Sequence, residues 1–216
     1  MSYHGAVKVG GTPDVRELAH LVITKIAVGP FDNNAYLLRC RATDRQLLID
    51  AAADAPVLLE TVGDGLETVV TTHRHQDHWQ ALDAVAAATG AGTAAGRLDA
   101  EGIGVRSDLL LDDGDTLCVG EVALTVRHLV GHTPGAIVLL YDDPQGHSHL
   151  FTGDCLFPGG PGRTTNPAEF TSLMDGLEAK VFDVLADETW IYPGHGNDST
   201  LGAERPQLAG WRARGW

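Results

Sequence analysis

The sequence lacks the cysteine content of a disulfide-stabilised protein. Its 216 residues include only three cysteines, an odd number at unrelated spacings. Such a set forms no disulfide framework and is more typical of a reducing compartment than of a secreted protein. The first eleven residues also lack a basic segment followed by an apolar core, so no signal peptide is expected. We therefore expect a cytoplasmic protein.

Long apolar runs and basic clusters are absent as well. No uninterrupted apolar run reaches the roughly 18 residues that a membrane-spanning helix needs. The formal net charge is −14 at pH 7, and no cluster of Lys or Arg offsets it. An acidic surface repels polyanions. Neither a membrane nor a nucleic acid is therefore expected as a partner.

The chain shows no internal repeat, no low-complexity stretch and no Pro/Gly/Ser linker, so we expect one domain over residues 1–216. Hydrophobic patterns and turn residues predict strands over residues 20–28, 35–40, 46–50, 66–71, 116–119, 121–129, 136–141, 147–152 and 189–192. Helices are expected over residues 54–61 and 79–88 and from Asn166 onward, with Asp54 and Asn166 as N-caps. Strands and helices that alternate in this way indicate a layered α/β architecture with the helices outside.

The chemistry is concentrated in one short segment directly after the expected strand at residues 66–71. Within six residues it contains His73, His75, Asp77 and His78. In extended backbone, His73 and His75 share a side and can hold one ion, whereas Asp77 and His78 follow a turn and can face a second. Imidazole and carboxylate ligands suit zinc, iron or manganese, and the absence of thiolates argues against a closed structural zinc site.

This segment resembles the His-x-His-x-Asp-His signature of the metallo-β-lactamase fold superfamily. The remaining landmarks of that family follow in order: His132 in a Gly-His-Thr-Pro-Gly segment, Asp154 in Thr-Gly-Asp, and His195 in Pro-Gly-His-Gly. The resemblance extends over roughly residues 20–200. It implies an αββα four-layer sandwich with a two-metal centre at one edge, between the two sheets.

The resemblance also implies a role for each of these positions. It assigns His73, His75 and His132 to a first divalent metal, and Asp77, His78 and His195 to a second. Asp154 would bridge the two ions, which are expected to be zinc, with iron or manganese as alternatives. A water shared by the ions would become hydroxide near neutral pH, and Asp77 would orient it as a catalytic residue.

Within the family, the sequence is most similar to glyoxalase II-like hydrolases. The bridging Asp154, the Asp77–His78 pair and residues 29–37 match that branch, as does the glycine-rich segment 159–164. Arg163 in this segment is a candidate for binding a substrate carboxylate, with loop stabilisation as the other interpretation. Only 21 residues follow His195, whereas glyoxalase II has a further helical region there. We therefore expect an enzyme that cleaves a small thioester or related ester.

Two other functions fit the same sequence. A persulfide dioxygenase would use a single iron held by His73 or His75, His132 and Asp154. A non-catalytic metal-binding protein on the same fold is a third hypothesis, against which the complete ligand set argues.

Five further residues are not expected to bind metal. His128 resembles a histidine that supports the ligands, and Asp50 is either a residue that supports the metal loop or a simple turn residue. His147 and His149 lie in an expected hairpin and are interpreted as solvated. Cys155 is interpreted as a small buried residue.

Overall fold

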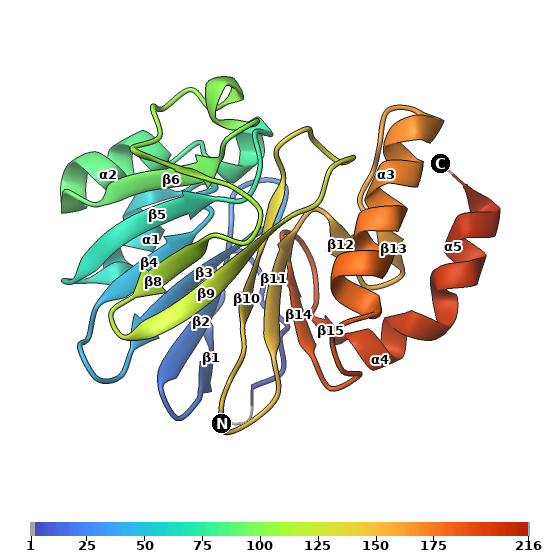
Figure 1. Cartoon of the computed structure of the whole chain (residues 1–216). Coiled ribbons are helices and arrows are strands. Elements are labelled where there is room, and N and C mark those ends of the chain that lie inside the picture. Colours follow the sequence, from blue (N-terminus) through green and yellow to red (C-terminus); the bar gives the residue numbers. More distant parts are fainter. Residues whose placement is uncertain (1–2, 216) are drawn as a thin grey trace.

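Two β-sheets packed face to face occupy the centre of the computed structural model, which describes residues 3–215 (Figure 1). Met1, Ser2 and Trp216, the outermost residues of the expected domain, lie outside the described residues. The seven strands of the first sheet follow in chain order: β1 Asp14–Glu17, β2 Leu21–Val28, β3 Asn33–Cys40, β4 Gln46–Ile49, β5 Leu66–Thr71, β6 Gly92–Gly96 and β7 Leu109–Leu111. β1 to β4 pair antiparallel, and β4 to β7 pair parallel.

The second sheet has six strands, in the spatial order β15 Ser199–Thr200, β14 Trp190–Pro193, β11 His149–Gly153, β10 Ile137–Tyr141, β9 Val122–His128 and β8 Thr116–Val119. Its strands pair antiparallel except for the parallel pair β11 and β14. A small separate hairpin is formed by β12 Leu156–Phe157 and β13 Gly160–Pro161.

Helices cover the outer face of each sheet. The first sheet carries α1 Ala55–Val62 and α2 Leu82–Thr89, whereas α3 Pro167–Leu177, α4 Leu201–Glu204 and α5 Leu208–Arg214 lie on the side of the second (Figure 1). The expected four layers are thereby confirmed. Among residues 3–215, no helix combines the length and apolarity needed to cross a bilayer.

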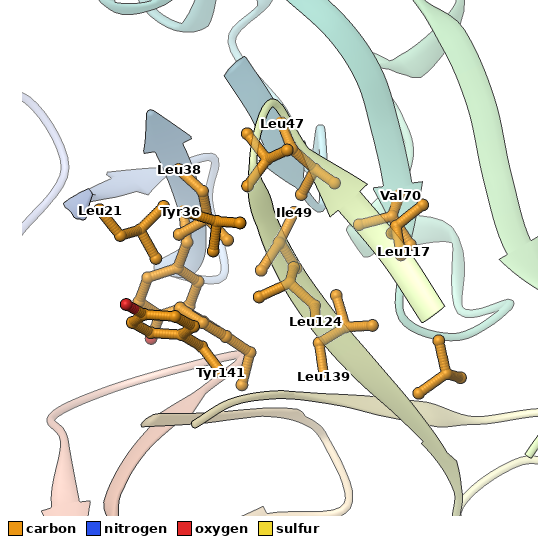
Figure 2. Close-up of a cluster of buried hydrophobic side chains, with 14 of the residues drawn as sticks. Leu21, Tyr36, Leu38, Leu47, Ile49, Val70, Leu117, Leu124, Leu139 and Tyr141 are labelled. Atoms are coloured by element: carbon orange, nitrogen blue, oxygen red, sulfur yellow. The ribbon is translucent and has the colours of Figure 1, made fainter. Parts of the chain in front are cut away.

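The central strands β4, β10 and β11 are buried along their whole length, whereas β8 and β9 alternate between buried and exposed residues and turn only one face to the core. Figure 2 shows Leu38 and Ile49 of the first sheet beside Leu124 and Leu139 of the second. Two further clusters pack the outer helices onto the sheets. This packing makes the sheets a rigid base for the loops at their edge.

Several expected elements are confirmed, and the differences have local causes. β5 and β8 have the expected bounds, and the Asn166 side chain caps α3 by accepting from the Glu169 N–H. Asp54 precedes α1 as expected, but its carboxylate accepts from the Gly29 N–H instead of capping the helix. α2 begins later than expected because a 3₁₀ turn, Gln76–His78, precedes it.

His149 is not solvated, so that expectation was wrong. Its side chain is fully buried on β11, and Nδ1 lies 2.8 Å from the Tyr192 hydroxyl oxygen. Burial, together with the positive charge that His147 and Arg16 bring, lowers the pKa of His149 to about 3. In the unfolded chain an imidazole titrates near ~6.5. Protonation below that pH therefore favours the unfolded state, and the native state loses stability between pH ~6.5 and 3.

We expect His149→Phe to flatten the pH dependence of stability in this window. Neutral His149 contributes its full stabilisation above pH ~6.5, and about 3 kcal/mol of it is lost by pH 4. A phenyl ring cannot titrate, so the difference in unfolding free energy between pH 7 and pH 4 should be smaller in the variant. Urea unfolding at both pH values measures it. Equal pH slopes in the two proteins would contradict the buried neutral imidazole.

Candidate metal centre

The seven residues singled out in the sequence converge at one edge of the two sheets, where each follows the end of a strand. His73, His75, Asp77 and His78 come after β5, His132 lies between β9 and β10, Asp154 follows β11, and His195 follows β14. The Ile137 N–H donates to the Thr72 carbonyl at 2.9 Å and joins the two sheets at this edge. These side chains form three overlapping groups, and within each group the ligand atoms lie within 4.8 Å of one another.

The first group consists of His73, His75 and His132. The Nε2 of His73 lies 3.0 Å from the Nδ1 of His75, and the His132 ring is within 4.7 Å of both other rings, measured between centroids. Burial, reinforced for His73 by the surrounding imidazoles, holds the pKa of His73 and of His132 below the ordinary value. These two rings are therefore neutral near pH 7, the form in which imidazole binds a cation.

The second group consists of Asp77, His78 and His195. The 3₁₀ turn Gln76–His78 follows His75 and places Asp77 and His78 beside His195, while the His78 ring stays 4.2 Å from that of His73, measured between centroids. Oδ2 of Asp77 lies 3.4 Å from Nε2 of His195 and 3.6 Å from Nε2 of His78. Gly194 lets Asp154 and His78 lie close to the loop of His195, since a Cβ there would come within 2.2 Å of the Asp154 carboxylate and 2.7 Å of the His78 ring.

Asp154 lies between the two groups. One carboxylate oxygen is 3.3 Å from His78 Nε2, and the other is 3.6 Å from His195 Nε2 and 3.7 Å from His132 Nε2. Burial opposes its charge, but the hydrogen bond and charge of His78 and the nearby histidines lower the pKa of Asp154. His132 Nε2 is buried without a hydrogen-bond partner among residues 3–215. A cation between the carboxylate and this nitrogen would satisfy both, so the donor set fits divalent metal ions.

Asp50 supports the second group, which decides between the two interpretations of this residue. It is buried in left-handed backbone after β4, and its carboxylate accepts from the Thr72 N–H at 2.7 Å and the Thr72 hydroxyl at 2.8 Å. The same carboxylate lies 2.8 Å from His78 Nδ1. Burial opposes a charge on His78, but Asp50 and Asp154 outweigh it and raise its pKa to about 10. A carboxylate behind a ligating imidazole fixes its orientation and strengthens it as a donor.

Asp99 supports the first group and was missed in the sequence. This fully buried carboxylate accepts from the Arg74 N–H at 3.0 Å, from the Thr133 hydroxyl, and from the Gly135 N–H at 2.7 Å. It therefore ties the loop of His73 and His75 to the loop of His132. Asp99 lies between β6 and β7, two strands that the sequence did not predict. Its three partners are 25 to 36 positions away, so the local sequence does not indicate its role.

We expect Asp99→Asn to weaken metal binding by about tenfold or more at the first group and far less at the second. An asparagine side chain has the shape of aspartate, but its nitrogen cannot accept a hydrogen bond. Residues that orient metal ligands typically contribute roughly 10–100-fold in metal affinity. Stepwise titration with Co²⁺, followed by absorption, resolves the two affinities. Asp108→Asn is a matched control, because Asp108 likewise accepts from a backbone N–H and a hydroxyl, both of Thr93. Equal losses at both groups would contradict this role of Asp99.

The loop of His195 is held by side chains from β2 and β3. Asn34 donates to the carbonyls of Pro193 and Gly196, and Tyr36 donates to that of Pro193. The buried ammonium of Lys25 donates to the Gly196 carbonyl at 2.8 Å and to Asp198 at 2.6 Å. Asn33 donates to the Asp77 carboxylate at 2.9 Å. The sequence predicted strands over residues 20–28 and 35–40 and matched residues 29–37 to the glyoxalase II-like branch, but it indicated none of these contacts.

The remaining candidates lie outside the cluster. His128 Nε2 is 2.8 Å from the Pro134 carbonyl oxygen, on the loop of His132. Cys155 is buried as expected, and burial raises the pKa of its thiol. Arg163 is exposed, and its carbonyl oxygen lies 2.7 Å from His132 Nδ1, which fixes the orientation of that ring. All three cysteines are free.

Comparison with known proteins gives this architecture a family context. A family model described as the metallo-beta-lactamase superfamily matches residues 28–195. The chain is 36% identical over 168 residues to a hydroxyacylglutathione hydrolase of Fuscovulum blasticum, covering 76% of this chain and 62% of the relative. It is 34% identical over 167 residues to the human mitochondrial persulfide dioxygenase ETHE1, covering 74% and 62%. These matches therefore span less than two thirds of either relative.

A solved structure with a chain of similar size has the same fold. The crystal structure of the BLEG-1 B3 metallo-beta-lactamase superposes with a TM-score of 0.75 at 26% identity, and the match covers 85% of this chain and 96% of that one. The αββα arrangement expected from the sequence is thus shared with this structure.

Proposed function

Since this chain belongs to the metallo-beta-lactamase superfamily, we propose that it is a metal-dependent hydrolase that cleaves a small thioester or a related ester. The observation that carries the proposal is the convergence of five imidazoles and two carboxylates in groups of metal-binding size. The relative that is a hydroxyacylglutathione hydrolase supports the thioester as the bond that is broken.

We propose two metal positions, with zinc as the expected metal. His73, His75 and His132 would hold one cation, and Asp77, His78 and His195 the other, with the two oxygens of Asp154 turned toward both. The spacing of Asp154 from His78 and His132 supports this division. Two divalent cations bound there supply a water of lowered pKa and polarise the carbonyl of the substrate.

The residues of the chain contribute orientation and proton transfer. Asp77 is partly exposed, and Asn33 fixes one of its oxygens by a hydrogen bond of 2.9 Å. This position lets the Asp77 carboxylate orient the attacking water and accept its proton. Buried Asp50 and Asp99 keep the histidines in place before the substrate arrives, so little reorganisation is needed during the reaction.

A persulfide dioxygenase is the second candidate, favoured by the 34% identity to the human enzyme. It would use His73 or His75 with His132 and Asp154 at a single iron. Persulfide dioxygenases retain much of the same motif, so the number and kind of metal bound, rather than the trio of Asp77, His78 and His195, separates the two candidates.

The two candidates separate in one experiment on the purified, metal-analysed protein. Hydrolysis is measured by thiol release from acyl thioesters and by ring opening of lactones and a β-lactam, and oxygen uptake is measured with glutathione persulfide. We expect thioester hydrolysis without oxygen uptake. Oxygen uptake with one iron per chain and no hydrolysis would establish the second candidate instead.

We also propose that residues 1–216 form one domain and that the protein works in the cytoplasm. The three free cysteines support a reducing setting of this kind.

A further inference from the structure

A short segment ahead of β1, residues 3–5, lies against the loop between β14 and β15 that contains His195. The Tyr3 hydroxyl donates to Asp198 Oδ2 at 2.6 Å, and the Asp198 N–H donates to the Gly5 carbonyl at 3.3 Å. The approach is close, because a Cβ on Gly5 would come within 2.5 Å of the Asp198 carboxylate. We call this segment the strap. It touches the chain three positions after a candidate ligand of the second metal-binding group.

The strap is fixed on its other side by β1. The N–H groups of His4 and Gly5 both donate to the Asp14 carboxylate at 2.8 Å. The guanidinium carbon of Arg16 lies 4.3 Å from the centroid of the Tyr3 ring, which is a cation–π contact. β1 belongs to the first sheet, whereas the loop that the strap contacts connects two strands of the second. The strap therefore fastens this loop to the first sheet.

A buried charge pair completes the contact. The side chains of Lys25 and Asp198 are fully buried, and Nζ lies 2.6 Å from Oδ1. The same ammonium donates to the carbonyls of Gly5 and Gly196, both at 2.8 Å. A buried charge is stable only when partners surround it in good geometry. A change in the strap therefore displaces Asp198, and with it the ammonium that holds Gly196.

The Gly196 carbonyl carries this contact to the metal centre. Gly196 directly follows His195 in left-handed backbone, and its carbonyl also accepts from Asn34 at 2.9 Å. His195 Nε2 lies 3.4 Å from the Asp77 carboxylate, within the second group. Metal affinity depends on ligand orientation, to which supporting residues contribute roughly 10–100-fold. A shift of the Lys25 ammonium would move His195 relative to its fellow ligands.

We propose that the strap, Lys25 and Asp198 together position His195 and so set the metal affinity of the second group. They act through the Gly196 carbonyl, whereas the first group is held by Asp99 and does not depend on them. This inference rests on the proposed second metal position. It extends the metal centre to residues outside the seven candidate ligands.

Gly5→Ala and Gly10→Ala form a matched pair that tests the strap. Both glycines precede β1 in left-handed backbone, at φ of 68° and 73°, so alanine strains the backbone to a similar extent in both. The new Cβ meets Asp198 only at position 5, since no atom of residues 3–215 lies within 4 Å of a Cβ at position 10. We expect Gly5→Ala to weaken Co²⁺ binding at the second group about tenfold. Its first group, and both groups of Gly10→Ala, should stay within about twofold of the wild type.

Stepwise Co²⁺ titration followed by absorption measures both affinities without turnover. His75→Ala, which damages only the first group, identifies the step that belongs to the second. The readout is the ratio of the two affinities, because a general loss of structure would weaken both groups together.

The double variant Lys25→Met/Asp198→Asn tests the same link without an unpaired charge. Removing one charge of a buried pair leaves the other uncompensated, whereas replacing both avoids this. Asparagine keeps an oxygen that accepts from the Tyr3 hydroxyl. The Gly196 carbonyl loses its ammonium donor, so we expect the second group to lose about tenfold or more in Co²⁺ affinity while the first is unchanged. Urea unfolding on the same sample establishes that the variant is folded.

The outcomes separate this inference from the proposed function. If the wild type binds two Co²⁺ ions and both Gly5→Ala and the double variant keep its ratio of affinities, the positioning role is wrong. Equal losses at both groups would also overturn it. If the variants behave as expected but the wild type cleaves no thioester, the positioning role stands and the proposed reaction fails. A wild type that binds one Co²⁺ ion, with equal affinity in His195→Ala, would overturn the second metal position and this inference with it.

Discussion

The Asp154→Asn variant is expected to lose at least about a thousandfold in kcat while it keeps its fold. Asp154 places a negative charge between the two histidine groups, within 3.7 Å of His78, His132 and His195. An amide has the same shape but no charge, so two cations would face each other without a shared anion. A barrier raised by about 4 kcal/mol corresponds to this loss. Steady-state hydrolysis of the best thioester, with metal analysis of the same sample, measures it.

Cys155→Ser is the control for Asp154→Asn. The neighbouring Cys155 is buried, its thiol is kept neutral by burial, and it lies outside the metal-binding groups. We expect its kcat to stay within a few-fold of the wild type, with a modest loss of stability from a buried hydroxyl. Should Cys155→Ser be the more damaging of the two, the role of Asp154 between the cations would be wrong.

The His75→Ala variant is expected to lose metal from the first group and to lower turnover more than ~100-fold. Residues that merely orient ligands contribute about 10–100-fold in metal affinity, and a direct ligand contributes more. His75 is an exposed side chain that points to His73 and His132, so its removal leaves the core intact. Metal content by mass spectrometry and thioester turnover are measured on one preparation.

Two observations make the His75 result specific. The second group should keep its metal, because Asp77, His78 and His195 are untouched. His20→Ala is the matched control, since His20 is an exposed histidine outside the metal-binding groups whose Nε2 lies 3.3 Å from the Gln145 side-chain nitrogen. Wild-type turnover in His75→Ala would remove this residue from the proposed site.

The sequence revealed the candidate ligands because local spacing and strand ends place them. His73 and His75 alternate on extended backbone and Asp77 and His78 follow a turn, so spacing allows two ions here, whereas His132, Asp154 and His195 were assigned by the resemblance to the family. β6 escaped prediction because its sequence, Gly-Thr-Ala-Ala-Gly, is short and buried and carries little strand propensity. The parallel strands were expected more readily where Val, Ile and Leu fill them, as in β5.

Asp50 and His128 were proposed from the sequence, but Asp99 and Lys25 could not be predicted, because their partners are distant in the sequence. Asp99 acts on loops at Arg74 and at Thr133–Gly135, and Lys25 acts on a loop 171 positions away. His149 lies in a segment that the sequence predicts as a surface hairpin, so it was expected to be solvated. In the structure, the parallel pairing of β11 with β14 buries it. Only the packing of the two sheets creates these environments.

The metal content of the purified wild-type protein tests the central claim most directly. Metal is counted per chain by mass spectrometry, and the count is repeated after chelation and titration back with Zn²⁺ while thioester hydrolysis is followed. We expect two divalent cations per chain, loss of activity when they are removed, and recovery as the second equivalent binds. A protein that binds no divalent cation under any of these conditions, or that hydrolyses thioesters equally well without one, would contradict it.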